Sequence, residues 1–169
     1  MLYPIGIQDF EKIRRDGYVY VDKTDLIYKM VQKGCYYFLS RPRRFGKSLL
    51  VSTMEAYFSG KKELFEGLAI SKLEKDWNQY PVLRFDFTGQ FYTTPDALED
   101  TLNTQLEALE KRFEINEPSG SAASRFRVLI DRAYESTGKP VVILIDEYDK
   151  PVVDNIAEES LSDIFRKQL

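Results

Sequence analysis

The sequence contains no histidine and a single cysteine, Cys35, among its 169 residues. One cysteine cannot form an internal disulfide, and without histidine a Cys/His metal site cannot be assembled. We expect Cys35 to be a small core residue. An excess of positive charge is also missing, because the formal net charge is −3. This charge argues against a general nucleic-acid-binding protein, whose binding face is basic, although it is compatible with a local basic patch.

Long hydrophobic runs are absent as well. The first residues, 1–6 (MLYPIG), lack a basic segment followed by an apolar one, and no apolar run approaches the ~20 residues that cross a bilayer. We therefore expect a cytoplasmic protein with no membrane partner. The length and the hydrophobic content of 43% suffice for one domain with a core. Within it we expect an N-terminal leader and helix at 1–34 that pack on a core at 35–169.

The most informative stretch is residues 36–50 (YYFLSRPRRFGKSLL), in which an apolar run enters a turn and leaves as a helix. The run at 36–39 is apolar throughout, which predicts a parallel strand covered on both faces in the middle of a sheet. The turn partly matches the phosphate-binding pattern G-x-x-x-x-G-K-[ST]. Arg41 stands where that pattern has its first glycine. A basic surface turn that contains Gly-Lys-Ser is therefore the alternative.

In a phosphate-binding loop, backbone N–H groups and the positive end of the next helix face a polyphosphate. Gly46 would allow close approach of the backbone, Lys47 would reach the terminal phosphates, and the Ser48 hydroxyl would coordinate Mg²⁺. Arg43 and Arg44 would contact phosphates or a neighbouring acidic strand end, or would be solvated. The predicted nucleotide-binding residues are Arg43, Arg44, Phe45, Gly46, Lys47, Ser48 and Leu49.

A second informative stretch is residues 141–151 (VVILIDEYDKP), where five apolar residues predict a fully buried strand. In an open α/β sheet ligands bind outside the carboxyl ends of the strands, so we expect Ser48 and Asp146 to meet there. Asp146 would hold Mg²⁺ together with Ser48, and Glu147 would orient or deprotonate the attacking water. The predicted catalytic residues are thus Glu147 and Lys47, with ATP and Mg²⁺ as cofactors. The alternative is an acidic strand end without a metal.

The rest of the chain predicts further strands and helices. Strand composition occurs at 18–21, and the alternation at 82–87 predicts a strand near a sheet edge, with Leu83, Phe85 and Phe87 on one face. Apolar residues at helical spacing predict helices over 10–13, 26–31, 49–58, 98–113, 126–134 and 161–169. The overall pattern is that of an α/β protein.

Four motifs follow one another along the chain: residues 4–10 (PIGIQDF), 20–24 (YVDKT), 40–48 (SRPRRFGKS) and 144–151 (LIDEYDKP). Together they resemble the AAA-ATPase-like domain family of bacterial proteins of unknown role. Arginine at the first loop position is usual in that family. The resemblance implies a three-layer P-loop NTPase core of the additional-strand class with a mostly parallel sheet. It also implies that Asp146 and Glu147 are the two-carboxylate motif and that the leader packs near the adenine.

The motifs and the resemblance favour a Mg²⁺-dependent ATPase whose hydrolysis drives an attached module. One alternative is a non-hydrolysing nucleotide-binding or scaffold domain. A less favoured alternative is a nucleic-acid-binding protein that uses the basic cluster at 41–47. Retention of Lys47, Ser48, Asp146 and Glu147 together favours the ATPase, because a scaffold could lose Glu147 without losing its fold.

The resemblance also implies that part of the ATPase core is missing from this sequence. Members of the family commonly continue into a further ATPase portion and often a PD-(D/E)XK nuclease-like domain, through which alone a nucleic-acid partner is expected. In the additional-strand class a strand inserts between the loop strand and the Asp-Glu strand, and no candidate for it follows Asp149. We therefore expect the core to be incomplete at its C-terminus, as an N-terminal part or truncated relative of a longer ATPase with weak activity alone. Its open sheet favours self-association or completion by the missing portion.

Overall fold

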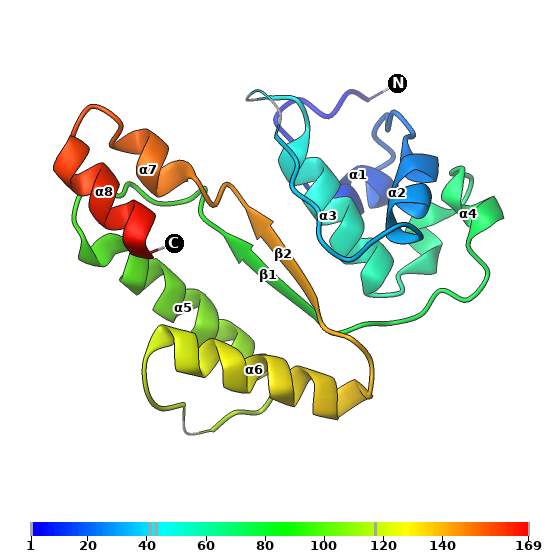
Figure 1. Ribbon diagram of the computed structural model, residues 1–169. Coiled ribbons are helices and arrows are strands. Elements are labelled where there is room, and N and C mark those ends of the chain that lie inside the picture. Colours follow the sequence, from blue (N-terminus) through cyan, green and yellow to red (C-terminus); the bar gives the residue numbers. More distant parts are fainter. Residues whose placement is uncertain (1, 41, 43, 117, 169) are drawn as a thin grey trace. The chain divides into compact units, whose positions relative to one another are not determined.

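The computed structural model describes residues 2–40, 42, 44–116 and 118–168. Within them it forms an α/β structure with a short parallel sheet (Figure 1). The chain divides into two compact units, Met1–Val82 and Leu83–Leu169, and each is described by itself. The division into a leader at 1–34 and a core at 35–169 stays a prediction. Among the described residues, no helix has both the length and the apolar character needed to cross a membrane.

The first unit consists of helices. In chain order they are α1 (Phe10–Arg15), α2 (Thr24–Val31), α3 (Lys47–Phe58), the 3-10 helix η1 (Lys62–Phe65) and α4 (Ile70–Leu73). Its core is aromatic: the Phe10 ring centroid lies 4.9 Å from that of Phe65 and 5.0 Å from that of Tyr20. The Phe10 backbone N–H donates to Ser52 Oγ at 2.9 Å, which ties α1 to α3. The predicted helix at 10–13 is confirmed, and its Phe10 and Ile13 are fully buried.

The Asp22-Lys23-Thr24 motif at the start of α2 is hydrogen-bonded to the start of α4. Asp22 Oδ1 accepts hydrogen bonds from the Thr24 N–H at 2.9 Å and from its hydroxyl at 2.7 Å, and Asp22 Oδ2 accepts from the Ala69 N–H at 2.7 Å. Thr24 Oγ1 in turn accepts from the Ile70 N–H at 3.0 Å. Desolvation raises the pKa of Asp22, but these hydrogen bonds outweigh it and hold the pKa below its ordinary value. Asp22 and Thr24 therefore serve the architecture of this unit.

The second unit contains the sheet and the remaining helices. Its elements are β1 (Val82–Asp86), α5 (Asp96–Arg112), α6 (Ala122–Thr137), β2 (Val142–Asp146), α7 (Lys150–Asp154) and α8 (Glu159–Gln168). Figure 1 shows β1 and β2 side by side and pointing the same way. The alternation predicted at 82–87 is confirmed, because Leu83, Phe85 and Phe87 are buried while Arg84 and Asp86 are partly exposed. The buried face packs on α5 and α6, as in the edge-to-face contact of Phe85 with Phe126.

The free side of β1 is closed at its carboxyl end by a side chain. Gln105 of α5 accepts from the Asp86 N–H at 2.7 Å and donates through Nε2 to the Asp86 carbonyl at 3.0 Å. The N–H and C=O of one strand residue point to the same side, so the Gln105 amide takes the place of a neighbouring strand there. On the other side the Phe87 N–H donates to the Asp146 carbonyl of β2 at 3.1 Å. This agrees with the prediction of a strand near a sheet edge.

The buried strand predicted at 36–39 is wrong for this structure. The segment has no strand assignment, and Tyr36 and Phe38 are 98% and 71% exposed. A parallel strand takes its hydrogen bonds from neighbours, and the described residues pair only β1 with β2 in a ladder. Without such partners, apolar composition alone does not specify a strand. The strand at 18–21 is also not formed, and the nearest feature is an isolated bridge between Leu2 and Tyr18.

The prediction of a fully buried strand at 141–145 is half right. The strand forms as β2, and Leu144 and Asp146 face the core, but Ile143 and Ile145 are 40% and 51% exposed. The reason is that helices of this unit cover one face of the sheet, whereas the prediction required cover on both. A three-layer P-loop core with a larger sheet therefore stays a proposal, and the fold that the structure establishes is α/β with two parallel strands.

Candidate functional site

The Gly-Lys-Ser sequence forms the start of α3. Gly46 has φ 75° and ψ 26°, in the left-handed region that glycine adopts without steric cost, and Lys47 and Ser48 follow in the first turn. The Leu50 N–H donates to the Gly46 carbonyl at 3.0 Å, which closes this turn. Gly46 offers no capping side chain, and the first turn contains no acidic residue. Neither a capping side chain nor an acidic residue of its own first turn compensates the positive end of this 12-residue helix.

The residues before α3 are accessible. Phe45 is 65% exposed, Arg44 and Gly46 are also exposed, and Lys47, Ser48 and Leu49 are half-buried. Arg44 has φ 66°, which is uncommon for a residue with a side chain and is found mostly where a loop is held in a special shape. Two further residues of the predicted loop, Arg41 and Arg43, lie outside the described residues. The accessible part of the predicted loop is therefore residues 44–49.

The carboxylate pair lies where β2 ends. Asp146 is 2% exposed as the last strand residue, and Glu147 is partly exposed. Glu147 has φ 54°, so this carboxylate is carried in the left-handed region. Its carbonyl accepts from the Lys150 N–H at 3.0 Å, which turns the chain into α7. Residues with a side chain in this region cluster at functional sites, which motivates a functional hypothesis for Glu147 beside Asp146.

The predicted site residues fall in both units. Lys47 and Ser48 belong to the first unit, and Asp146 and Glu147 belong to the second. The structure brings together the members of each pair, and the meeting of Ser48 with Asp146 stays a prediction. Among the described side chains, no group of three or more acidic or cysteine residues could hold a metal ion. Hydroxyl and carboxylate oxygens are ligands of the kind that Mg²⁺ takes, usually together with phosphates and waters.

Sequence reasoning missed the loop between β1 and α5 as part of this edge of the sheet. The loop begins with Asp86 Oδ1 accepting from the Thr88 N–H at 2.8 Å, and Lys150 Nζ donates to the Gln90 carbonyl at 2.9 Å. Phe91 in the same loop is 85% exposed. The available signal was Lys150 itself, because it lies within the motif at 144–151 and yet was given no role.

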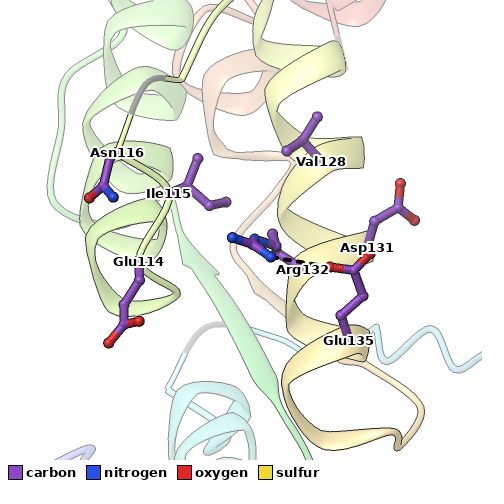
Figure 2. A pocket seen from close by; sticks show the side chains of 7 residues that line it. All are labelled: Glu114, Ile115, Asn116, Val128, Asp131, Arg132 and Glu135. Atoms are coloured by element: carbon purple, nitrogen blue, oxygen red, sulfur yellow. Dashed lines mark hydrogen bonds and ion pairs between the residues drawn. The ribbon is translucent and has the colours of Figure 1, made fainter.

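A shallow depression lies elsewhere in the second unit (Figure 2). Its volume is about 310 Å³, and it is formed between the end of α5 and the middle of α6. The lining residues are Glu114, Ile115, Asn116, Val128, Asp131, Arg132 and Glu135. None of the predicted site residues lines it. Arg132 forms an ion pair with Glu135 at 3.3 Å, so its cation is already compensated within the depression.

Comparison with known proteins shows the family to which the chain belongs. The family model described as "Predicted AAA-ATPase" matches residues 4–169, and the chain belongs to this AAA-ATPase-like family. A relative from Azotobacter chroococcum mcd 1, described as "Uncharacterized protein in vnfD 5'region", is 42% identical over 161 residues. The match covers 94% of this chain and 31% of the relative, so the chain spans about a third of that protein's length. No solved structure matches the chain.

Proposed function

We propose that the chain is the nucleotide-binding part of a Mg²⁺-dependent ATPase. The observation that carries the proposal is Gly46-Lys47-Ser48 at the start of α3, with a left-handed glycine and neither a capping side chain nor an acidic residue in the first turn. The family membership supports it, because a predicted AAA-ATPase is expected to bind ATP. The strained Glu147 that follows the buried Asp146 supports hydrolysis as well as binding. The three-layer P-loop core belongs to the same proposal.

Each residue has a role in this proposal. Backbone N–H groups at the start of α3 hold the phosphates, and Lys47 places its ammonium against the terminal ones. Ser48 and Asp146 hold Mg²⁺, which neutralises phosphate charge when bound. Glu147 orients the attacking water and accepts its proton. Arg44 and Phe45, which are exposed ahead of α3, are proposed contacts of the nucleotide, and Arg43 is proposed beside them.

Binding without turnover is the second candidate for the chain by itself. The specific observation that favours it is the exposed segment at 36–39, because this segment would support the predicted loop as a strand of a complete sheet. An arginine that stabilises the transition state is commonly worth about 10³–10⁵ in rate, and such a residue is expected in the missing portion or in a second copy. In the proposal, nucleotide is therefore the partner of the chain, with self-association or a C-terminal portion completing it.

The decisive experiment is thermal unfolding with MgATP, MgGTP and a single-stranded oligonucleotide in parallel. A ligand at a hundred times its dissociation constant adds about 2.7 kcal/mol to the free energy of unfolding. We expect MgATP to stabilise the chain and Lys47→Ala to remove that stabilisation, measured for each variant against its own ligand-free free energy of unfolding. Lys33→Ala, an equal charge change at an exposed residue outside the predicted loop, is the matched control and should keep the response.

Two results would overturn the proposal. An unchanged MgATP response in Lys47→Ala would remove the start of α3 from the binding site. Stabilisation by the oligonucleotide but not by either nucleotide would instead support the nucleic-acid-binding alternative. Equal responses to MgATP and MgGTP would leave nucleotide binding in place and reject base selectivity.

A further inference from the structure

Two loops lie next to each other at the carboxyl end of the sheet in the second unit. One is the loop after β1, at 87–95, and the other is the turn after β2 that contains Glu147. They start from adjacent positions, because the Phe87 N–H donates to the Asp146 carbonyl at 3.1 Å. The loop after β1 is shaped at its start by Asp86 Oδ1, which accepts from both the N–H and the hydroxyl of Thr88, at 2.8 and 2.6 Å.

Lys150 reaches from the second loop to the first. Its Nζ donates to the Gln90 carbonyl at 2.9 Å and lies 5.5 Å from the centroid of the Phe91 ring and 5.6 Å from that of Tyr92. The same ammonium is paired with Asp154 one turn along α7. The Lys150 side chain is only 20% exposed. A lysine bound on so many sides holds the loop in place rather than extending into solvent.

The loop backbone is fixed at a second point while one ring stays outside. Asn155 Nδ2 donates to the Tyr92 carbonyl at 2.6 Å, and Tyr92 itself is 1% exposed with its hydroxyl donating to the Phe87 carbonyl at 3.2 Å. Phe91, between the two carbonyls held by Lys150 and Asn155, is 85% exposed. The Phe91 ring is therefore exposed on a backbone that is held on both sides by residues of the turn after β2 and of α7.

The backbone of Lys150 is joined to Glu147. The Lys150 N–H donates to the Glu147 carbonyl at 3.0 Å, and Glu147, the first residue of this turn, has φ 54°. One residue thus contacts both loops: its backbone N–H donates to the Glu147 carbonyl, and its ammonium contacts the Gln90 carbonyl and the Phe91 ring. We infer that Lys150 is a positioning residue that couples the conformation of Glu147 to the loop after β1, so that nucleotide binding changes the environment of Phe91. The inference rests on the proposed function.

The test uses a tryptophan at position 91 as reporter. In Phe91→Trp, MgATP is expected to shift the fluorescence of the new tryptophan, with the unsubstituted chain giving the constant background of Trp77. Adding Lys150→Gln is expected to abolish that shift while calorimetry still detects MgATP binding. Lys150→Arg keeps the cation and a donor for Gln90, so it should restore part of the shift. Lys167→Gln on α8, an equal charge change at an exposed residue, should leave the shift unchanged.

A second measurement needs no nucleotide. Lys150→Gln should speed amide hydrogen exchange of residues 88–92 by about tenfold, which corresponds to about 1.4 kcal/mol. Unchanged exchange would show that Lys150 does not hold the loop and would overturn the inference. A tryptophan shift that persists in Lys150→Gln, or that is absent while MgATP binds, would overturn the coupling and leave the proposed function standing. Calorimetry without any MgATP binding would reject the proposed function and the coupling with it.

Discussion

Glu147 combines a carboxylate with a backbone conformation that suits glycine. Left-handed φ costs an L-residue roughly 1–2 kcal/mol, so Glu147→Gly should raise the free energy of unfolding by about 1 kcal/mol relative to Glu147→Ala. The same change removes the proposed base, so turnover should fall to background as stability rises. Glu147→Gln keeps the strain and is the control: it should bind MgATP, lose turnover and gain no stability. Urea unfolding and a phosphate-release assay measure both quantities.

Either half of this prediction can fail separately. Equal stability of the glycine and alanine variants would mean that position 147 is unstrained in solution. Turnover that survives in Glu147→Gln would make Glu147 a structural residue of the turn into α7.

Asp22 makes the stability of the first unit depend on pH in the acid range. Its folded-state pKa lies below the ordinary 3.8, since hydrogen bonds from Thr24 and Ala69 outweigh desolvation. A depressed pKa contributes stability that is present above the unfolded pKa and is lost as the pH falls through the folded one. The free energy of unfolding should therefore drop from about pH 4 downward, and Asp22→Asn should flatten this part of the curve. An acid limb of the same steepness in Asp22→Asn would assign it to other carboxylates.

At the scale of elements, α5 and α6 are joined by a buried ion pair. Arg125 donates to both oxygens of Glu110 at 2.9 and 2.6 Å and to Asn103 Oδ1 at 2.6 Å, and the Glu110 side chain is only 2% exposed. Arg125→Met strands this carboxylate and should cost about 3–5 kcal/mol. Glu110→Leu combined with Arg125→Met should recover most of the loss, because no buried charge is then left unpaired. Denaturant unfolding measures both variants.

The matched control for this pair lies on the same helix. Arg132 pairs with Glu135 at the surface, where both side chains are more than half exposed, so Arg132→Met should change stability by less than about 1 kcal/mol. A similar small effect of Arg125→Met would show that the Glu110 carboxylate finds water in solution.

The longer helices were predictable from the sequence, whereas the short helices η1, α4 and α7 were not and the strands were predictable only in part. Helix periodicity is local, so the apolar spacing at 98–113 and 126–134 sufficed to locate α5 and α6. The strand at 82–87 was predictable because apolar and polar residues alternate along it, as expected for a strand that is covered on one face only. The conformation of the segment at 36–39 was not predictable, since a strand needs hydrogen-bonded partners that composition does not encode.

The candidate site, too, was only partly predictable from the sequence. Gly46 at a helix start and Asp146 at a strand end follow from the local sequence, and the structure has both. The role of Lys150 did not follow, because its partner Gln90 lies 60 residues away and contributes a backbone carbonyl, which leaves no trace in side-chain patterns.

At the scale of the whole molecule, exposed apolar side chains gather in the first unit at 36–39. We expect the isolated chain to associate through this segment as its concentration rises, because exposed apolar surface favours burial against another surface. Phe38→Lys, at a side chain that is 71% exposed, should reduce the association without lowering the melting temperature. Ile156→Lys, equally exposed at 71%, is the control and should leave association unchanged. Sedimentation velocity over a concentration series measures the effect, and equal behaviour of both variants would move the contact elsewhere.

The Gln105 amide makes the two sides of the sheet unequal for the addition of a further strand. At its carboxyl end β1 has its outward hydrogen-bonding groups occupied by Gln105, whereas β2 has no second strand beside it among the described residues. A strand that added to β1 at this end would have to displace the Gln105 amide. Two copies that paired through their β2 edges would leave outside two β1 strands whose Asp86 backbone groups are already bonded to Gln105. Further strands would then have to displace Gln105 at that point, which disfavours the extension of such a pair into a fibre.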